Sequence, residues 1–262
     1  MQSFKSGTEI IHFRDEGARN DFAIVFANSL GTDLRVWDEV IKELNQEYRT
    51  VRFDKRGHGL STNSEDSISI EALAKDLKLL ISYLKIKKIC LVGLSIGGLI
   101  ALEFFKKNPL YLKGLVLSDT AAKIGTSDMW SERIRRIKSG GIEAISDDIL
   151  ARWFSNEFLK TKMGPLQLWR SMLTRTSLSG YLGCCEAILN CDLTEEAKTV
   201  NVPTLLIVGD EDGSTPVNLV KDTAKLIENS EFKIIKGAGH LPCVEKPRIF
   251  AEELVRFLEK LE

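Results

Sequence analysis

Ser95 is the residue whose surroundings most favour covalent chemistry. It lies in the sequence Gly-Leu-Ser-Ile-Gly-Gly at residues 93–98, directly after an apolar run at 88–92 and before a helical pattern that starts at Ile96. A G-x-S-x-G sequence between a strand and a helix is typical of a nucleophile elbow, a strained turn whose small flanking residues let the serine hydroxyl project above the sheet. The helix N-terminus also presents the Ile96 amide to a developing oxyanion. We therefore predict Ser95 as the nucleophile and Ile96 as half of an oxyanion hole.

A serine nucleophile needs a base, and His240 is the only histidine in the last three quarters of the chain. It follows the strand-like run at 232–235 within a glycine-rich loop, which can return the imidazole to the edge of a sheet. An imidazole can take and give a proton near neutral pH. The structural alternative is a buried histidine bonded to a backbone carbonyl, and this is how we interpret His12 and His58.

The base in turn needs a carboxylate to orient it, and acidic residues follow two of the predicted strands. Asp210, Glu211 and Asp212 come in a row after one strand, and Asp119 comes after an earlier one. An acid between the nucleophile and the histidine, at the C-terminal end of a strand, suits this role. The residues themselves leave these candidates open, since an acid that does not orient the imidazole could be a solvated turn residue.

The elements that must position these side chains alternate along the chain. Buried parallel strands are predicted by the apolar runs at 23–26, 49–53, 89–92, 115–117 and 205–208, and helices by the spacing of apolar residues at 33–46, 69–85 and 96–107. This alternation predicts an α/β fold with a mostly parallel central sheet flanked by helices. Strand patterns vanish from about 125 to 195, so we expect a core of residues 1–124 and 196–262 and a helical cap, residues 125–195, inserted in it.

The composition argues against several other classes of protein. The 36 Lys and Arg residues are offset by 37 Asp and Glu, so a nucleic-acid partner has no electrostatic support. The five cysteines include no C-x-x-C pair and the three histidines lie far apart, so we expect no metal and reduced thiols. Residues 93–98 lack the Gly-Lys-Ser/Thr and G-x-G-x-x-G patterns of phosphate-binding loops. Without a leader-like N-terminus or a run of ~18 apolar residues, we expect a cytoplasmic protein with no membrane partner.

With these residues in hand, the chain resembles the α/β-hydrolase superfamily over its whole length, and within it the 3-oxoadipate enol-lactonases of aromatic catabolism. Beside the elbow, the resemblance rests on Asn28-Ser29-Leu30-Gly31-Thr32-Asp33 with Trp37, Asp119-Thr120-Ala121-Ala122-Lys123-Ile124-Gly125 with Trp130 and Arg133, Arg152-Trp153-Phe154, and Gly180-Tyr181 before Cys184-Cys185. It implies a small enol-lactone substrate with one carboxylate, opened by water to 3-oxoadipate in the β-ketoadipate pathway, without any cofactor.

The resemblance also implies roles for individual residues. Members of the superfamily usually carry the acid three residues after the glycine that ends the strand, which favours Asp212, although some place it where Asp119 stands. The resulting chain order of Ser, Asp and His is that of the superfamily. The second oxyanion amide would come from Leu30. Asn28 and Ser29 depart from the pattern here, because many relatives have His-Gly at these positions.

Arg133 gives an indication of the substrate's charge. If residues 128–138 form a helix, Arg133 shares the apolar face of Trp130, whereas Arg135 and Arg136 point away. A guanidinium on an inward face can bind a carboxylate through two hydrogen bonds. The alternative is that Arg133 extends past the helix edge into water. Together with the resemblance, the spacing predicts that Arg133 binds the substrate carboxylate and that Trp130 beside it is a pocket wall or an indole donor.

Two further interpretations remain open. The first is a general carboxylesterase or a carbon–carbon bond hydrolase on the same scaffold, because the fold and the triad alone do not select a substrate. The second is a small-molecule receptor that uses a hydrolase pocket without turnover. Neither spacing nor composition indicates whether Trp153, Cys184 or Cys243 lines the pocket.

Overall fold

The computed structural model describes residues 1–44, 47–64 and 67–261, which are built around one sheet of eight strands. The strands, in chain order, are β1 (Gln2–Ser6), β2 (Glu9–Glu16), β3 (Phe22–Ala27), β4 (Thr50–Phe53), β5 (Lys88–Leu94), β6 (Leu112–Ser118), β7 (Thr204–Gly209) and β8 (Ser230–Ile235). Their order across the sheet is β1-β2-β4-β3-β5-β6-β7-β8. The six strands from β4 to β8 in this order pair in parallel. At one edge, β1 and β2 form an antiparallel hairpin, and β2 also pairs antiparallel with β4.

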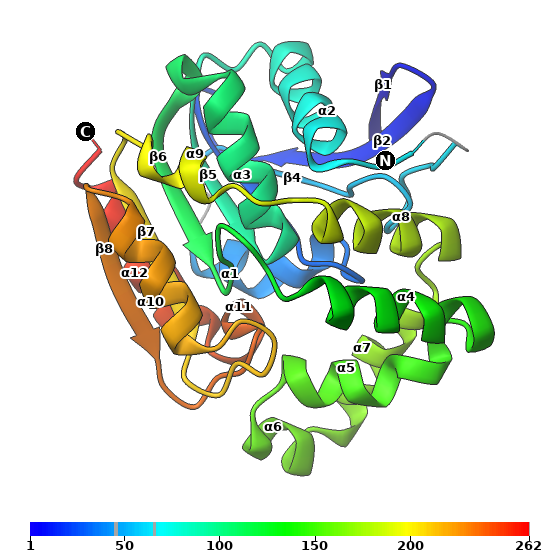
Figure 1. Cartoon of the computed structure of the whole chain (residues 1–262). Coiled ribbons are helices and arrows are strands. Elements are labelled where there is room, and N and C mark those ends of the chain that lie inside the picture. The colour runs from blue at the N-terminus through cyan, green and yellow to red at the C-terminus, as the bar shows by residue number, and fades with distance from the viewer. Residues whose placement is uncertain (45–46, 65–66, 262) are drawn as a thin grey trace.

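Helices cover both faces of the sheet (Figure 1). One face carries α2 (Ile70–Tyr83), α3 (Ile96–Lys107), α9 (Thr194–Lys198) and α10 (Val217–Leu226); the other carries α1 (Asp38–Glu43), α11 (Pro242–Glu245) and α12 (Pro247–Leu258). Because both faces are covered, the central strands are apolar throughout, and every residue of β7 is buried. Short 3-10 turns, η1 (Leu34–Trp37), η2 (Pro109–Tyr111) and η3 (Glu143–Ile145), join some of these elements.

The predicted mostly parallel α/β sheet is confirmed, with two differences in detail. The helix expected at 33–46 is a 3-10 turn, η1, followed by the short helix α1, because Asp33 caps η1 by accepting a hydrogen bond from the Arg35 amide. Residues 45 and 46 lie outside the described residues. The hairpin of β1 and β2 was not predicted, since its strands alternate polar and apolar residues and therefore lack the continuous apolar run of a central strand.

The segment between β6 and β7 is helical, and most of it projects from the sheet (Figure 1). It contains α4 (Ser127–Gly140), α5 (Ser146–Trp153), α6 (Asn156–Thr161), α7 (Met163–Thr174) and α8 (Leu178–Leu189), followed by α9, which lies against the core and is joined to α3 by the ion pair of Lys106 and Glu196. The expected cap limits of 125 and 195 stay a prediction. Within the described ranges, no helix has the length and apolar character needed to span a membrane.

Candidate active site

Ser95 occupies a sharp turn between β5 and α3. Its backbone has φ 58° and ψ −118°, a combination that side-chain-bearing residues rarely adopt. Three hydrogen bonds hold the turn: the Ser95 amide donates to the Ser118 carbonyl at 2.9 Å, and the Ser95 carbonyl accepts from the Gly98 amide at 2.8 Å and the Thr120 hydroxyl at 2.7 Å. Strain of this kind persists only where surrounding contacts enforce it, which is the expected property of a nucleophile elbow.

The flanking glycines are required by close backbone contacts. A Cβ atom on Gly93 would lie 2.3 Å from the Gly97 carbonyl oxygen, and one on Gly97 would lie 2.1 Å from the Ala27 carbonyl oxygen. No larger residue fits at either position without moving β5, β3 or the start of α3. The G-x-S-x-G spacing therefore reflects how tightly this turn packs against the neighbouring strand.

His240 and Asp212 meet at the carboxyl end of the sheet. The imidazole Nδ1 lies 2.9 Å from Asp212 Oδ2, and both side chains are buried. Asp212 Oδ1 accepts from the amides of Ser214 at 2.6 Å and Thr215 at 3.0 Å, and Oδ2 also accepts from the Thr215 hydroxyl at 2.6 Å. Burial alone would raise the pKa of Asp212, but the charge and hydrogen bond of His240, together with Thr215, hold it below its usual range. Asp212 is thus an ionised acceptor that can fix the orientation of the imidazole.

Asp119, the other acid considered, lies beside this pair. Its side chain is fully buried, with Oδ2 accepting from the Ser118 hydroxyl at 2.6 Å and Oδ1 from the Gly209 amide at 2.9 Å. Burial and the nearby charge of Asp212 raise its pKa well above the usual range. Ligand atoms of Asp119, Asp212 and His240 lie within 4.8 Å of one another, close enough to hold a metal ion, but protein hydrogen bonds already engage each residue.

Loops that follow β7 and β8 are tied to each other. The Glu211 amide donates to the Ala238 carbonyl at 2.9 Å, and Asp210 Oδ1 accepts from the Gly237 amide at 2.7 Å. Glu211 Oε2 accepts from both the backbone and the side-chain nitrogen of Asn156, each at 2.9 Å. Asp210 and Glu211 are therefore exposed turn residues with a structural role. Asp210 braces the loop of His240, and Glu211 joins the loop of Asp212 to α6.

Further contacts bind the end of α5 to the same two loops. The Gly213 amide donates to the Arg152 carbonyl and the Leu241 amide to the Trp153 carbonyl, each at 3.3 Å. Glu245, which sequence reasoning did not single out, accepts from the Gly239 amide at 2.7 Å and from the Ser155 hydroxyl at 2.5 Å. A glutamate five residues after a histidine gives no sequence signal for this bridge.

Among the described residues, the expected hydrogen bond between the Ser95 hydroxyl and His240 is not formed. Ser95 is 7% exposed and His240 is 2% exposed, but the hydrogen bonds of the described residues include none to the Ser95 hydroxyl. Hydrogen bonds between a nucleophile and its base are often long in ligand-free enzymes and tighten when substrate binds. Ser95 follows β5, Asp212 follows β7 and His240 follows β8, so all three lie at the carboxyl edge of the sheet.

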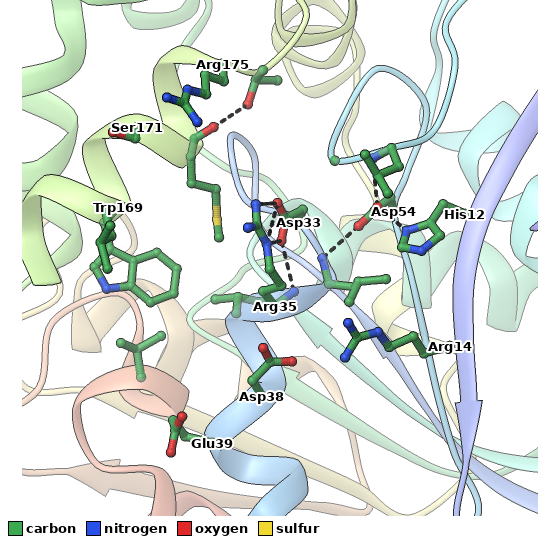
Figure 2. A pocket seen from close by; sticks show the side chains of 18 of the residues that line it. His12, Arg14, Asp33, Arg35, Asp38, Glu39, Asp54, Trp169, Ser171 and Arg175 are labelled. Atoms are coloured by element: carbon green, nitrogen blue, oxygen red, sulfur yellow. Dashed lines mark hydrogen bonds and ion pairs between the residues drawn. The ribbon is translucent and has the colours of Figure 1, made fainter. Parts of the chain in front are cut away.

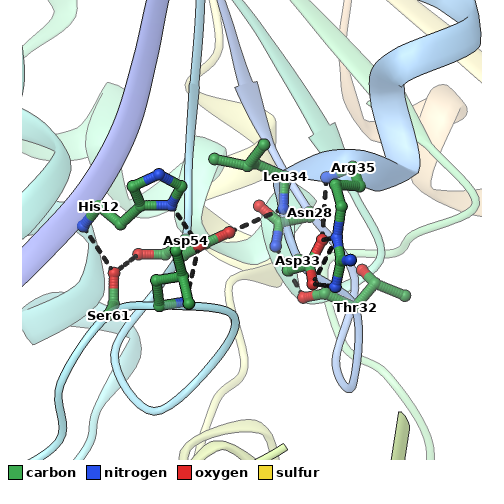
Figure 3. Close-up of polar contacts among 9 residues, drawn as sticks. His12, Asn28, Thr32, Asp33, Leu34, Arg35, Asp54 and Ser61 are labelled. Atoms are coloured by element: carbon green, nitrogen blue, oxygen red, sulfur yellow. Dashed lines mark hydrogen bonds and ion pairs between the residues drawn. The ribbon is translucent and has the colours of Figure 1, made fainter. Parts of the chain in front are cut away.

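Leu30, the expected second oxyanion donor, lies in a firmly held loop after β3. Asn28 Nδ2 donates to the Thr32 carbonyl at 2.8 Å (Figure 3), and the Thr32 amide and hydroxyl donate to the Ser29 carbonyl at 3.2 and 3.0 Å. In the described part of the chain, no carbonyl or side chain accepts from the Leu30 amide. Ile96, as the first residue of α3, has no carbonyl four residues earlier within the helix to accept its amide. Asn28 thus braces the loop that carries Leu30.

Helices of the inserted segment form an apolar roof over this loop. A Cβ atom on Gly31, whose φ is 76°, would lie 2.6 Å from Leu173, 3.0 Å from Tyr181 and 3.4 Å from Trp153. These three side chains are buried. The roof excludes water from the loop that carries Leu30, and Trp153, whose place in the site was left open by the sequence, is part of it.

Trp130 and Arg133 lie together on α4. Trp130 is buried, and its indole nitrogen donates to the Ile124 carbonyl at 2.7 Å, so its N–H is engaged within the protein and Trp130 can serve only as a wall. The Arg133 guanidinium carbon lies 4.9 Å from the centroid of that indole ring. Burial raises the pKa of the Tyr181 hydroxyl and Arg133 opposes this rise, so the guanidinium lies within electrostatic reach of the roof.

Arg133 differs from its neighbours in having no acidic partner. Arg135 binds Glu132 and Arg136 binds Asp148, whereas no ion pair within the described residues involves Arg133. Arg133 is half-buried, and its charge opposes the rise that burial causes in the pKa of Tyr181 and of Cys185, both on α8. A half-buried cation without a counterion is suited to bind an anion from outside.

A separate groove of about 1040 Å³ lies behind the loop of Leu30, between η1 and α7 (Figure 2). Ser95, Asp212 and His240 do not line it. Its charged side chains are largely paired within the protein (Figure 3). Arg35 donates to Asp33, and Asp54 accepts from the His12 ring and from the backbone amides of Leu34 and Leu60. His12 is half-buried and its Nδ1 bonds the Asp54 carboxylate at 2.8 Å, so its partner is a side chain and not the backbone carbonyl expected for it. His58 is also buried, with Nδ1 donating to the Arg56 carbonyl at 3.0 Å.

Comparisons with known proteins agree with this geometry. Residues 24–253 match the model of a family described as the alpha/beta hydrolase family. A curated relative, 3-oxoadipate enol-lactonase 1 of Acinetobacter baylyi, is 31% identical over 246 residues, which is 94% of this chain and 92% of the relative. The crystal structure of the enol-lactonase from Burkholderia xenovorans LB400 superposes with a TM-score of 0.94 at 31% identity, covering 98% of this chain and 100% of that one. A thermophilic esterase from Thermogutta terrifontis, at 25% identity, covers 100% of this chain and 99% of its own with a TM-score of 0.92. The chain belongs to the alpha/beta hydrolase family.

Proposed function

We propose that this protein is a serine hydrolase that opens a small carboxylated enol-lactone, 3-oxoadipate enol-lactone, to 3-oxoadipate within the β-ketoadipate pathway. Its catalytic triad is Ser95, His240 and Asp212, and the amides of Leu30 and Ile96 form the oxyanion hole. The strained Ser95 turn and the hydrogen bond of 2.9 Å between His240 and Asp212 support the hydrolytic part of this proposal. Similarity to two enol-lactonases supports the substrate class.

In the first half of the reaction, the Ser95 hydroxyl oxygen attacks the lactone carbonyl carbon while His240 accepts the hydroxyl proton. The carbonyl oxygen gains negative charge, which the two amides stabilise because they point at it before the reaction begins. The ring carbon–oxygen bond then breaks. The enol oxygen leaves with the proton from His240, and the acyl group stays on Ser95.

The second half of the reaction releases the acid. Because the enol remains tethered to the acyl chain, its conversion to the ketone removes the oxygen nucleophile that could close the ring again. His240 then accepts a proton from water, and the resulting hydroxide attacks the acyl carbon. Ser95 leaves with the proton from His240, and the product is a free carboxylate.

The observation that carries the substrate assignment is the unpaired Arg133. Its guanidinium lies over Trp130 and within electrostatic reach of Tyr181 in the roof of the loop that holds Leu30, and we propose that the lactone carboxylate binds there. A charge-assisted contact to a carboxylate contributes on the order of 1.5 to 3 kcal/mol when partly desolvated. Trp130 supports Arg133 as an apolar wall.

A general carboxylesterase is the second candidate, favoured by the similarity to the Thermogutta esterase. The two candidates differ in whether a carboxylate on the substrate matters. An esterase of broad specificity would hydrolyse a neutral ester of similar size at least as well as the enol-lactone. A receptor without turnover would hydrolyse neither.

The deciding experiment is steady-state hydrolysis of the enol-lactone beside a neutral ester of similar size, with wild type and Ser95→Ala. We expect a higher kcat/KM for the lactone and loss of turnover for both substrates in Ser95→Ala. Preference for the neutral ester would replace the lactonase with the esterase. Full turnover by Ser95→Ala would contradict the nucleophile itself.

A further inference from the structure

Lys55 is a buried cation with an unusual set of partners. It directly follows Asp54 at the end of β4, and it is 2% exposed. Its ammonium nitrogen donates to the Ser29 carbonyl at 2.6 Å and to the Thr32 carbonyl at 3.2 Å. Within the described ranges it forms no ion pair with a carboxylate. Burying a lysine without a counterion costs free energy of folding, so a functional reason for its place is expected.

The Ser29 carbonyl belongs to the same peptide group as the Leu30 amide. A trans peptide is planar and its C=O and N–H point in opposite directions, so a partner that fixes the carbonyl also aims the N–H away from itself. A positive charge at the oxygen also polarises the peptide group and strengthens the N–H as a donor. Lys55 therefore acts, through one peptide plane, on the amide assigned to the oxyanion hole.

The lysine is not needed to satisfy these carbonyls. The Ser29 carbonyl also accepts from the amide and the hydroxyl of Thr32, at 3.2 and 3.0 Å, and the Thr32 carbonyl also accepts from Asn28 Nδ2 at 2.8 Å (Figure 3). An uncharged side chain of similar length in place of Lys55 would leave neither oxygen without a partner. Such a substitution would remove only the positive charge at the Ser29 carbonyl oxygen, on the opposite side of the peptide group from the Leu30 N–H.

We infer that Lys55 is a positioning residue of the oxyanion hole, which orients and polarises the Leu30 amide from behind. The inference rests on the proposed function in one respect, namely that Leu30 donates to the oxyanion. Because the oxyanion exists in the transition state and not in the bound ester, Lys55 contributes to kcat and leaves KM nearly unchanged.

The charge of Lys55 changes in an accessible range of pH. Burial lowers the pKa of its ammonium to about 8, although Cys184, Asp54 and Asp33 oppose this shift. Of its other titratable neighbours, burial and the charge of Lys55 lower the pKa of His58 well below its usual range, and burial raises the pKa of Cys184 to about 11. Between about pH 7 and about pH 9, Lys55 changes charge rather than His58 or Cys184.

The test compares Lys55→Met with Lys88→Met, using hydrolysis of a neutral chromogenic ester. Lys88 is a matched control because its ammonium also donates to a backbone carbonyl, that of Leu110 at 2.7 Å, but at an exposed site. We expect Lys55→Met to lower kcat on the order of 10- to 100-fold with KM nearly unchanged, because a weakened oxyanion donor costs somewhat less than a removed one. Lys88→Met should match wild type. Thermal unfolding at pH 7 should show Lys55→Met no less stable than wild type.

The pH dependence gives a second readout. The ratio of the wild-type kcat to the Lys55→Met kcat should fall as pH rises through about 8, because wild type then loses the charge that the variant lacks. Lys55→Gln, which keeps a donor, should give an intermediate kcat. The inference would be overturned if the ratio of the two kcat values stayed constant with pH. It would also be overturned if KM rose in Lys55→Met by the same factor by which kcat fell. The assay uses a neutral ester and does not depend on the natural substrate. If the wild-type protein did not hydrolyse the enol-lactone, the lactone assignment would be wrong, but the inference about Lys55 would still be tested.

Discussion

Replacing Arg133 with Met tests whether the protein recognises an anionic substrate. Methionine keeps an apolar stem over the Trp130 ring, whose centroid lies 4.9 Å from the Arg133 guanidinium carbon, and removes only the charge and its donors. Arg135→Met is the matched control, because Arg135 lies on the same helix but binds Glu132 at the surface. The comparison therefore isolates a guanidinium without a counterion from one that has a partner.

The magnitude follows from the contact that would be lost. A charge-assisted hydrogen-bonded pair contributes about 1.5 to 3 kcal/mol, and each 1.4 kcal/mol is a factor of ten, so kcat/KM for the enol-lactone should fall about 10- to 150-fold in Arg133→Met. The loss should be mainly in KM, because the carboxylate is bound equally in the ground and transition states. A neutral ester should change less than about 3-fold, since it makes no such contact.

Steady-state kinetics on both substrates, in buffers of low and high salt, is the assay. Added salt should weaken the wild-type preference for the lactone, because ions screen a partly exposed charge pair. Equal losses on the lactone and the neutral ester would remove Arg133 from substrate recognition. The same loss in Arg135→Met would indicate a general effect on the helix instead.

Two predictions concern buried carboxyl groups around the proposed triad. Burial and the charge of Asp212 raise the pKa of Asp119 well above its usual range in the folded protein, so its contribution to stability is lost as pH rises above about 4, the usual pKa of an unfolded aspartate. In thermal unfolding, Asp119→Asn should therefore gain stability relative to wild type as pH rises from about 4 towards neutral, and a constant difference would contradict this. Glu245→Ala leaves the Gly239 and Ser155 amides without their acceptor and should cost about 1 to 3 kcal/mol in urea unfolding; an unchanged midpoint would contradict that bridge.

The sharp turn at Ser95 could be predicted because its determinants are local. The glycines at 93 and 97 leave room for carbonyl oxygens that would otherwise lie within 2.3 Å of a Cβ, and the preceding strand and following helix are strongly apolar. The choice between Asp119 and Asp212 could not be made from the residues alone. Both follow strands that end at the same sheet edge, and only the packing of the loops decides which carboxylate meets His240.

Residues whose roles depend on distant segments left no signal in the sequence. Lys55 lies between two charged residues in a turn-rich segment, which is typical of a surface lysine, but the loop of Ser29 and Thr32 folds over it. Glu245 likewise gains its role from the end of α5 and the loop of Gly239. In both cases the decisive partner comes from another part of the chain, beyond the reach of local patterns.

The identity of the nucleophile is tested most directly by labelling with a serine-directed phosphonate followed by mass spectrometry of the intact protein and its peptides. We expect one phosphonyl group per chain, located on Ser95, with loss of ester hydrolysis in proportion to labelling and no adduct in Ser95→Ala. An adduct on another residue that abolishes activity, or full hydrolysis by a protein labelled completely at Ser95, would contradict the proposed mechanism.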